Sequence, residues 1–236
     1  MITIIIPAHN EHDNLKILLP ALNCSSLTCP MEIIVALSNE NSDNCEEMDV
    51  DGNVRFIKSS KKGRAVQMNT AAANAKGNIL VFLHADVRPP KSFLLDIRAA
   101  LKEGYDAGFF SYRFDKKSLL LKMNASFTGQ NGIFTGGGDQ CLFIRKQIFF
   151  SLGKFDEKQV VMEDFEFFER MKINNVRYKI IRNDLIVSAR KYNNNSYLRV
   201  NLSNLLLVVL FKFGYPAEKL KSLHGRLLRM PYHSNS

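Results

Sequence analysis

The stretch NILVFLHADVRPP, Asn78–Pro90, joins an apolar run to a polar end. Ile79–Leu83 has the length and the continuous apolar character of a strand that is buried on both faces. His84 and Asp86 follow directly, and two prolines then stop the strand. A histidine and a carboxylate at this point lie where the chain leaves the core, so a ligand can reach them.

Short apolar runs alternate with helical patterns in the first part of the chain. Strands are predicted at Ile2–Pro7, Glu32–Leu37 and Val54–Ile57. One helix is predicted to begin after Asn10, which would cap it, and two more helices are predicted at Arg64–Lys76 and Lys91–Lys102. This alternation indicates an α/β fold with a mostly parallel, Rossmann-like sheet flanked by helices. Ligands of such sheets bind beyond the carboxyl ends of the strands.

The second part of the chain is less regular. Strands are predicted at Ala107–Phe114 and Gln140–Arg145, and as a pair at Val176–Ile181 and Leu185–Ala189. Helices are predicted at Met162–Ile173, Ser196–Phe213 and Ala217–Met230. We therefore expect a C-terminal helical segment after the last strand.

The composition is that of a globular protein, with 46% apolar and 23% charged residues in 236. No apolar stretch approaches the roughly 20 residues that span a bilayer. The first residues read as a strand and lack the basic region of a signal peptide. The cysteines show no CxxC spacing; they are Cys24, Cys29, Cys45 and Cys141. We expect reduced thiols and a cytoplasmic location.

The net charge of +9 is concentrated at the C-terminal end. From Arg170 onward the chain has 13 lysines and arginines and two acidic residues, a net charge of +11. Such a segment attracts phosphates, nucleic acid or an anionic membrane surface. It lacks the interleaved aromatic and basic residues typical of a nucleic-acid surface, so we expect no nucleic-acid partner.

The apolar run LLLVVLF, Leu205–Phe211, leaves three alternatives open. It is buried within the chain, it is buried in a homodimer, or it inserts shallowly at a membrane surface. The basic residues that would support a peripheral membrane contact are Arg199, Lys212, Lys219, Lys221, Arg226 and Arg229.

Asp86 is the sharpest candidate for chemistry. A carboxylate at a strand end suits a divalent cation that also binds phosphate oxygens, although an aspartate before prolines is also common in turns. His84 is a weaker metal ligand, a hydrogen-bond donor to phosphate, or simply a hydrogen-bonded histidine.

Glu163 and Asp164 open a predicted helix and form the second candidate. One of them could act as a general base in a cleft, or both could simply suit the positive end of the helix dipole. Arg64 follows Gly63 at a helix start, where it would either meet a pyrophosphate or remain solvated. The loop GGGDQ, Gly136–Gln140, allows close approach of a ligand to the backbone but matches no standard phosphate-binding pattern.

Five segments, taken in order, resemble family 2 glycosyltransferases of GT-A fold. They are ITIIIPAHNE (Ile2–Glu11), EIIVALSNENSD (Glu32–Asp43), KGRAVQMNTAAANAKGNILVFLHAD (Lys62–Asp86), GGGDQCLFIRK (Gly136–Lys146) and MEDFEFFERMK (Met162–Lys172). The set is most similar to the subgroup called transferase 2, rSAM/selenodomain-associated, or arsenosugar-biosynthesis-type glycosyltransferases. Ser188–Leu220 resembles the C-terminal region of that subgroup.

The resemblance implies an inverting, hexosyltransferase-like enzyme that moves a sugar from a UDP- or GDP-sugar to a hydroxyl acceptor with Mg²⁺ or Mn²⁺. It implies a GT-A domain over residues 1–190, with a nucleotide half to about 90 and an acceptor half from about 91, and a basic helical extension over 191–236 packed on that domain.

The resemblance also implies a role for each matching residue. Pro7, Ala8, Glu11 and Arg64 would bind the donor, and Asp86 would bind the metal, with His84 as a weak second ligand. Asp164 would be the base with Glu163 beside it, and Asp139 and Gln140 would line the acceptor side.

Two departures from the family pattern keep alternatives open. The second strand ends in Val35–Glu40 without the usual aspartate, which bears on nucleotide identity, and His84 replaces the first acid of the metal motif. The alternatives are a catalytically weakened nucleotide-sugar-binding protein and a nucleotidyltransferase. The latter would normally have a glycine- and lysine-rich loop after the first strand.

Overall fold

The computed structural model describes residues 1–23, 30–132 and 134–228. The strands are β1 (Ile2–Ala8), β2 (Met31–Leu37), β3 (Val54–Lys58), β4 (Ile79–Phe82), β5 (Val87–Arg88), β6 (Ala107–Phe114), β7 (Leu142–Arg145) and β8 (Tyr178–Val187). The α-helices are α1 (His12–Asn23), α2 (Arg64–Asn74), α3 (Phe93–Lys102), α4 (Leu119–Ser126), α5 (Lys146–Ser151), α6 (Glu163–Ile173), α7 (Tyr197–Lys212) and α8 (Ala217–Leu227). Short 3₁₀ helices are η2 (Cys45–Glu47), η3 (Phe127–Gly129), η4 (Gly138–Gln140) and η5 (Arg190–Tyr192).

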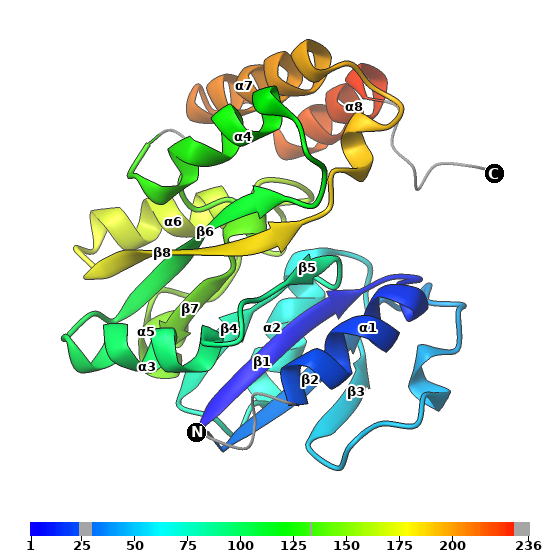
Figure 1. The fold of residues 1–236 in the computed structure, drawn as a ribbon, viewed down its shortest axis with the longest axis vertical. Coiled ribbons are helices and arrows are strands. Elements are labelled where there is room, and N and C mark those ends of the chain that lie inside the picture. Colours follow the sequence, from blue (N-terminus) through cyan, green and yellow to red (C-terminus); the bar gives the residue numbers. More distant parts are fainter. Residues whose placement is uncertain (24–29, 133, 229–236) are drawn as a thin grey trace.

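One sheet runs through the molecule in the order β3-β2-β1-β4-β7-β6-β8-β5 (Figure 1). The pairs β3–β2, β2–β1, β1–β4 and β6–β8 are parallel. Strand β7 is antiparallel to both β4 and β6, and β5 is antiparallel to β8. The prediction of a mostly parallel sheet is therefore confirmed.

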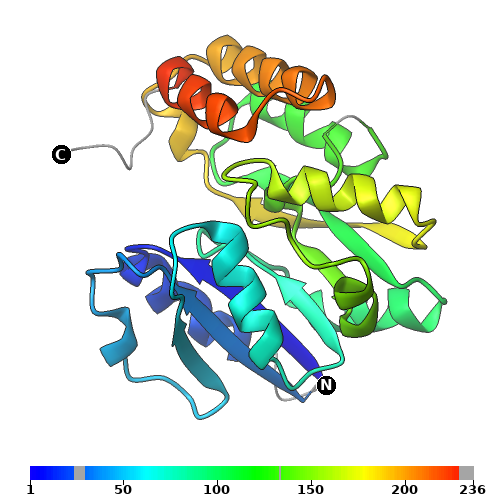
Figure 2. The ribbon, with the colours of Figure 1, turned by 180° about the vertical axis from the view of Figure 1, so that it is seen from behind.

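Helices cover both faces of the sheet. Figure 1 looks onto the face with α1 and α3, and Figure 2 looks onto the face with α2, α5 and α6. Strand β1 contributes Ile4 and Ile6 to the hydrophobic core on one face of the sheet and Ile5 to the core on the other face. Burial on both faces explains why its sequence is a continuous apolar run rather than an alternating one.

Two local predictions are wrong. The two strands expected at Val176–Ile181 and Leu185–Ala189 are one strand, β8, whose register with β6 shifts between Phe110 and Tyr112. The polar residues between them do not form a turn, because their side chains bond to other segments. Arg182 donates to the Gly129 carbonyl, Asn183 donates to Ser92 and Asp96, and Asp184 accepts from Ser111.

Asn10 was expected to cap the first helix, and this too is wrong. Its φ is 55°, and its side-chain oxygen accepts a hydrogen bond from the Ser42 N–H at 2.9 Å. The His12 N–H at the helix start instead donates to Asp43 at 2.7 Å. A carboxylate from the loop after β2 thus suits the positive end of α1.

Helix α4 was missed, and α8 ends at Leu227, because Leu228 has an extended backbone. The expected end of that helix at Met230, together with Arg229, lies outside the described residues, as do Cys24 and Cys29. Cys45 and Cys141 are buried free thiols.

We predict that Gly108→Ala destabilises the fold. A methyl group on Gly108 would lie 2.5 Å from the Lys179 carbonyl oxygen of β8 and would also clash with the Phe143 ring of β7. Overpacking of this kind costs about 1–3 kcal/mol, which urea unfolding would measure. Gly52→Ala is the matched control, because nothing lies within 4 Å of its added methyl group. Equal midpoints for the two variants would contradict the prediction.

Candidate functional site

The ends of β1 and β4 meet the first turns of α2 and α6. Gln67 of α2 ties the first two strands together, because its amide nitrogen donates to the Ala8 and Ala36 carbonyls at 2.8 Å each. Ala8 is buried and Pro7 is half-buried. This bonding fixes the strand edge along which candidate residues gather.

Arg64, at the start of α2, is the centre of the site. Its Nε donates to Glu163 at the start of α6, and its Nη2 lies 3.3 Å from Asp164 Oδ2. The Glu163 side chain is only 2% exposed. A buried carboxylate requires such a partner, because an unpaired buried charge is costly.

The two neighbouring carboxylates are driven apart in pKa. Burial raises the pKa of Asp164 from 3.8 to about 6, and the adjacent Glu163 charge contributes to this rise. Burial acts in the same direction on Glu163, but the Arg64 guanidinium prevails and holds the pKa of Glu163 below its ordinary 4.5. The pKa values of the two adjacent carboxyl groups are therefore shifted in opposite directions, which is a feature typical of functional sites.

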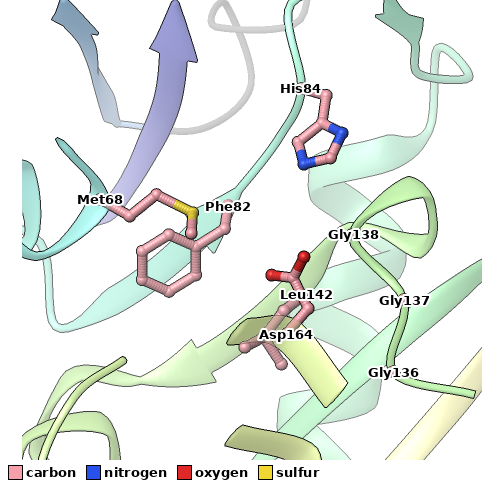
Figure 3. Close-up of a pocket in the computed structure, with 8 residues that line it drawn as sticks. All are labelled: Met68, Phe82, His84, Gly136, Gly137, Gly138, Leu142 and Asp164. Atoms are coloured by element: carbon pink, nitrogen blue, oxygen red, sulfur yellow. The ribbon is translucent and has the colours of Figure 1, made fainter. Parts of the chain in front are cut away.

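His84, at the end of β4, faces the same place. Its Nε2 lies 3.5 Å from Arg64 Nη1, and its Nδ1 lies 3.7 Å from Asp139 Oδ1. Figure 3 shows the Asp164 carboxylate and the His84 ring pointing toward the space beside Gly138. The His84 ring and the Asp164 carboxylate thus both lie against the glycine-rich loop at Gly138.

Gly138 allows this loop to approach the other side chains. An added methyl group would lie 2.6 Å from both Asp164 Oδ2 and His84 Cε1. With any other residue at this position, either the loop or these side chains would have to shift. The groups that approach this loop closely here are protein side chains, and the predicted approach of a ligand stays a prediction.

Gln140 ends this loop and is buried. Its side-chain oxygen accepts from the Gly136 N–H at 2.9 Å, and its nitrogen donates to the Thr128 carbonyl at 3.0 Å. Asp139 beside it is partly exposed. Burial alone would raise the pKa of Asp139, but Lys191 and His84 hold it below its usual range. Gln140 therefore holds the loop, and Asp139 presents an ionised carboxylate.

Asp86 bonds to a residue that sequence reasoning missed. The Arg190 guanidinium in η5 lies 2.8 Å from Asp86 Oδ2 and 3.3 Å from Glu11 Oε1. Asn14 also donates to Glu11, at 2.6 Å. One cation thus joins the carboxylates that follow β1 and β4.

His224 and Lys191 are two further basic groups of this region. Burial lowers the pKa of His224 in α8, and the positive charges of Lys191 and Arg64 add to this effect. In the sequence, Arg190 and Lys191 could have been found as a pair of basic residues directly after the last predicted strand. Nothing in the local pattern of α8 indicates His224.

Within residues 1–23, 30–132 and 134–228, no three histidine, cysteine or acidic side chains come together as a metal centre. Asp86 is a single carboxylate with Arg190 on one oxygen. This donor set still fits Mg²⁺ or Mn²⁺ in a substrate-assisted site, because Mg²⁺ usually takes one or two carboxylates together with substrate phosphates and water.

Comparison with solved structures identifies the fold. A mannosyltransferase, PcManGT from Pyrobaculum calidifontis in complex with GDP-Man and Mn²⁺, has 16% sequence identity and a TM-score of 0.66, over 96% of this chain and 69% of the other. Residues 1–349 of TarS from S. aureus have 16% identity and a TM-score of 0.62, over 89% of this chain and 65% of the other.

Glucosyl-3-phosphoglycerate synthase from Mycobacterium tuberculosis, in complex with Mn²⁺, UDP and glucosyl-3-phosphoglycerate, has 15% identity and a TM-score of 0.58, over 92% of this chain and 81% of the other. At these identities the likeness establishes the fold, which is the GT-A fold. No curated protein matches the chain.

The family model described as Glycosyl transferase family 2 matches residues 3–151. This match covers more than half of the chain, and the protein belongs to glycosyl transferase family 2. The expected family is therefore confirmed.

We predict opposite pH dependences for two neighbouring substitutions. Because the pKa of Asp164 is raised, its ionisation costs stability as pH rises from about 4 through 6. Asp164→Asn should therefore be about 1–3 kcal/mol more stable than the wild type at pH 8, and this advantage should disappear near pH 4.

Glu163→Gln is the matched comparison. The pKa of Glu163 is lowered, so its charge contributes stability above 4.5 that is lost as pH falls. The variant should be less stable than the wild type at pH 8, with a smaller loss below pH 4.5. Thermal melts at several pH values measure both effects, and shifts of the same sign at pH 8 would contradict the assignment.

Proposed function

We propose that this protein transfers a sugar from a nucleoside diphosphate sugar to an acceptor hydroxyl, with inversion at the anomeric carbon. The observation that carries the proposal is the pair of carboxyl groups at the start of α6, whose pKa values are shifted in opposite directions. Glu163 is held ionised by Arg64, and Asp164 lies beside Gly138 with a pKa of about 6. A base with this pKa is mostly ionised at pH 7 and still accepts a proton readily.

In the proposed reaction one proton moves, one bond forms at the anomeric carbon and one bond at that carbon breaks. Asp164 accepts the proton of the acceptor hydroxyl, and the acceptor oxygen forms a bond to the anomeric carbon. The bond between that carbon and the diphosphate oxygen breaks on the opposite face, which inverts the configuration. Glu163 does not compete for the proton, because its carboxylate is bound by Arg64.

Donor binding is proposed along the ends of β1 and β4. Pro7, Ala8 and Glu11 would border the nucleoside, and Asp86 would lie at the diphosphate. Basic residues that would offset the departing negative charge are Arg64, Arg190 and Lys191. The solved structures of similar fold include complexes with UDP, UDP-GlcNAc and GDP-Man, which supports a UDP- or GDP-sugar and a hexosyl group.

A divalent cation, Mg²⁺ or Mn²⁺, is proposed at Asp86. Bound there, it would supply positive charge to the diphosphate leaving group. The His84 ring contacts Arg64 and Asp139. We therefore assign the cation to Asp86, which contacts Arg190 through Oδ2.

The acceptor side is proposed at the glycine-rich loop. Asp139 would contact the acceptor directly, and Gln140 would act by holding the loop. We also propose the division into a GT-A domain over 1–190 and a helical extension over 191–236, and membership of the rSAM/selenodomain-associated subgroup. The ordered sequence motifs support both proposals.

We predict that Asp164→Asn binds donor like the wild type but releases nucleoside diphosphate at least about 100-fold more slowly, because an amide cannot accept the proton. Nucleotide release from a panel of UDP-, GDP- and dTDP-sugars measures the rate, and thermal shifts with and without Mn²⁺ measure binding. Asp139→Asn is a comparison on the other side of the pocket.

Near-native release by Asp164→Asn would remove Asp164 from the mechanism. Binding without release by the wild-type protein would instead favour the catalytically weakened nucleotide-sugar-binding protein.

We predict that Asp86→Ala weakens Mn²⁺-dependent binding of UDP or GDP by about tenfold or more, because the cation loses its carboxylate. Calorimetry with each nucleotide, with and without Mn²⁺, measures this difference. Asp13→Ala is the control, since that carboxylate is fully exposed on α1. Unchanged, metal-dependent affinity in Asp86→Ala would contradict the metal assignment.

A further inference from the structure

Helix α7 exposes an apolar stripe. Its members recur at helical spacing on one side of the helix and are Leu198, Leu202, Leu205, Leu206, Val209 and, just after the helix, Phe213. Leu198 is 68% exposed and Phe213 is 85% exposed. The opposite side of α7 is packed, with Val200, Leu207 and Val208 buried. The run Leu205–Phe211 is thus only partly buried within the chain.

A second apolar surface lies on α4 and η3. Leu119, Leu120, Met123 and Phe127 are exposed, whereas Leu121 and Ala125 are buried toward the domain. Leu119 is 76% exposed and Phe127 is 70% exposed. This helix was not predicted, so the apolar surface is larger than the C-terminal sequence indicated.

The two helices lie side by side at the end of the molecule that is distant from the N-terminus (Figures 1 and 2). Asn124 of α4 donates to Asn201 of α7 at 2.8 Å, which ties the helices together. We call the exposed residues of the previous two paragraphs the apolar end face. Monomeric proteins seldom leave large apolar patches exposed without a partner.

The apolar end face has basic residues around it. Lys116, Lys117 and Lys122 lie on or before α4, and all are exposed. Arg199 and Lys212 lie on α7, and α8 adds Lys219 and Arg226 against the single acid Glu218. Lys221 of α8 instead lies toward Glu40, in the loop after β2. Apolar side chains bordered by lysine and arginine are the combination that binds anionic lipid surfaces.

We propose that the apolar end face docks on an anionic lipid bilayer, with its leucine and phenylalanine side chains inserted among the lipid headgroups and its basic border against the lipid phosphates. No helix in the described part of the chain is long and apolar enough to cross a bilayer, so the contact is a shallow one. The proposal is independent of the reaction proposed above.

A second copy of the chain is the competing occupant, and charge argues against it. A twofold interface places the same patch of both subunits face to face. The basic borders of two copies would then meet each other, and like charges across an interface are unfavourable. An anionic surface is complementary to the border.

Co-sedimentation with vesicles tests the proposal. The full chain should sediment with vesicles of phosphatidylcholine and phosphatidylserine, weakly with phosphatidylcholine alone, and less at high salt. The double variant Leu202→Glu/Phe213→Glu should bind anionic vesicles about tenfold more weakly, since two charges would enter the apolar layer. The control Ile17→Glu/Ile173→Glu makes the same charge change at exposed apolar residues on α1 and α6 and should bind like the wild type.

The serine pair Leu202→Ser/Phe213→Ser repeats the test without added charge, and thermal melts establish that each variant is folded. Light scattering measures the oligomeric state. Absence of wild-type binding to anionic vesicles at low salt would overturn the proposal. So would equal binding by the test and control variants, or a dimer that the Leu202→Glu/Phe213→Glu pair dissociates while vesicle binding persists.

Discussion

The Arg64 guanidinium is the group that allows two adjacent buried carboxylates to lie side by side in the site. It joins the first turn of α2 to the first turn of α6, across 99 residues of chain. Without this cation, two adjacent carboxylates would share a largely buried position and repel each other. With it, Glu163 stays ionised and Asp164 keeps a raised pKa. The difference between neighbouring carboxyl groups therefore arises from which of them Arg64 binds more closely.

The glycine-rich loop depends on the same arrangement. Gly138 can lie against Asp164 and His84 only because it has no side chain. Gln140, from inside the protein, holds that loop by bonding to backbone atoms on both sides. A buried amide therefore ties the loop to the rest of the protein, and the His84 ring and the Asp164 carboxylate both lie against Gly138. Gln140, which was expected to line the acceptor side, can thus act by holding the backbone of the loop in place.

Much of the fold could be predicted because strand burial and strand ends are local features of the sequence. The ends at Glu11 and Asp86 were visible as polar residues after apolar runs. Arg190 was not, because its partner Glu11 is 179 residues away. Strand β8 was divided in the prediction because Arg182–Asp184 has the polarity of a turn, and only tertiary contacts with Gly129, Ser92 and Ser111 explain its extended form.

The continuous sheet has a consequence for how the protein can move. Strands β4 and β7 pair residue by residue from Ile79 with Arg145 to Phe82 with Leu142, and this pairing joins the half of the sheet formed by β3, β2, β1 and β4 to the half formed by β7, β6, β8 and β5. A hinge between the halves would have to break these backbone hydrogen bonds, and buried unpaired backbone groups are costly. Movement near the site is therefore least restricted in the parts that take no part in strand pairing, namely the loops at the strand ends and helix α8, which carries His224.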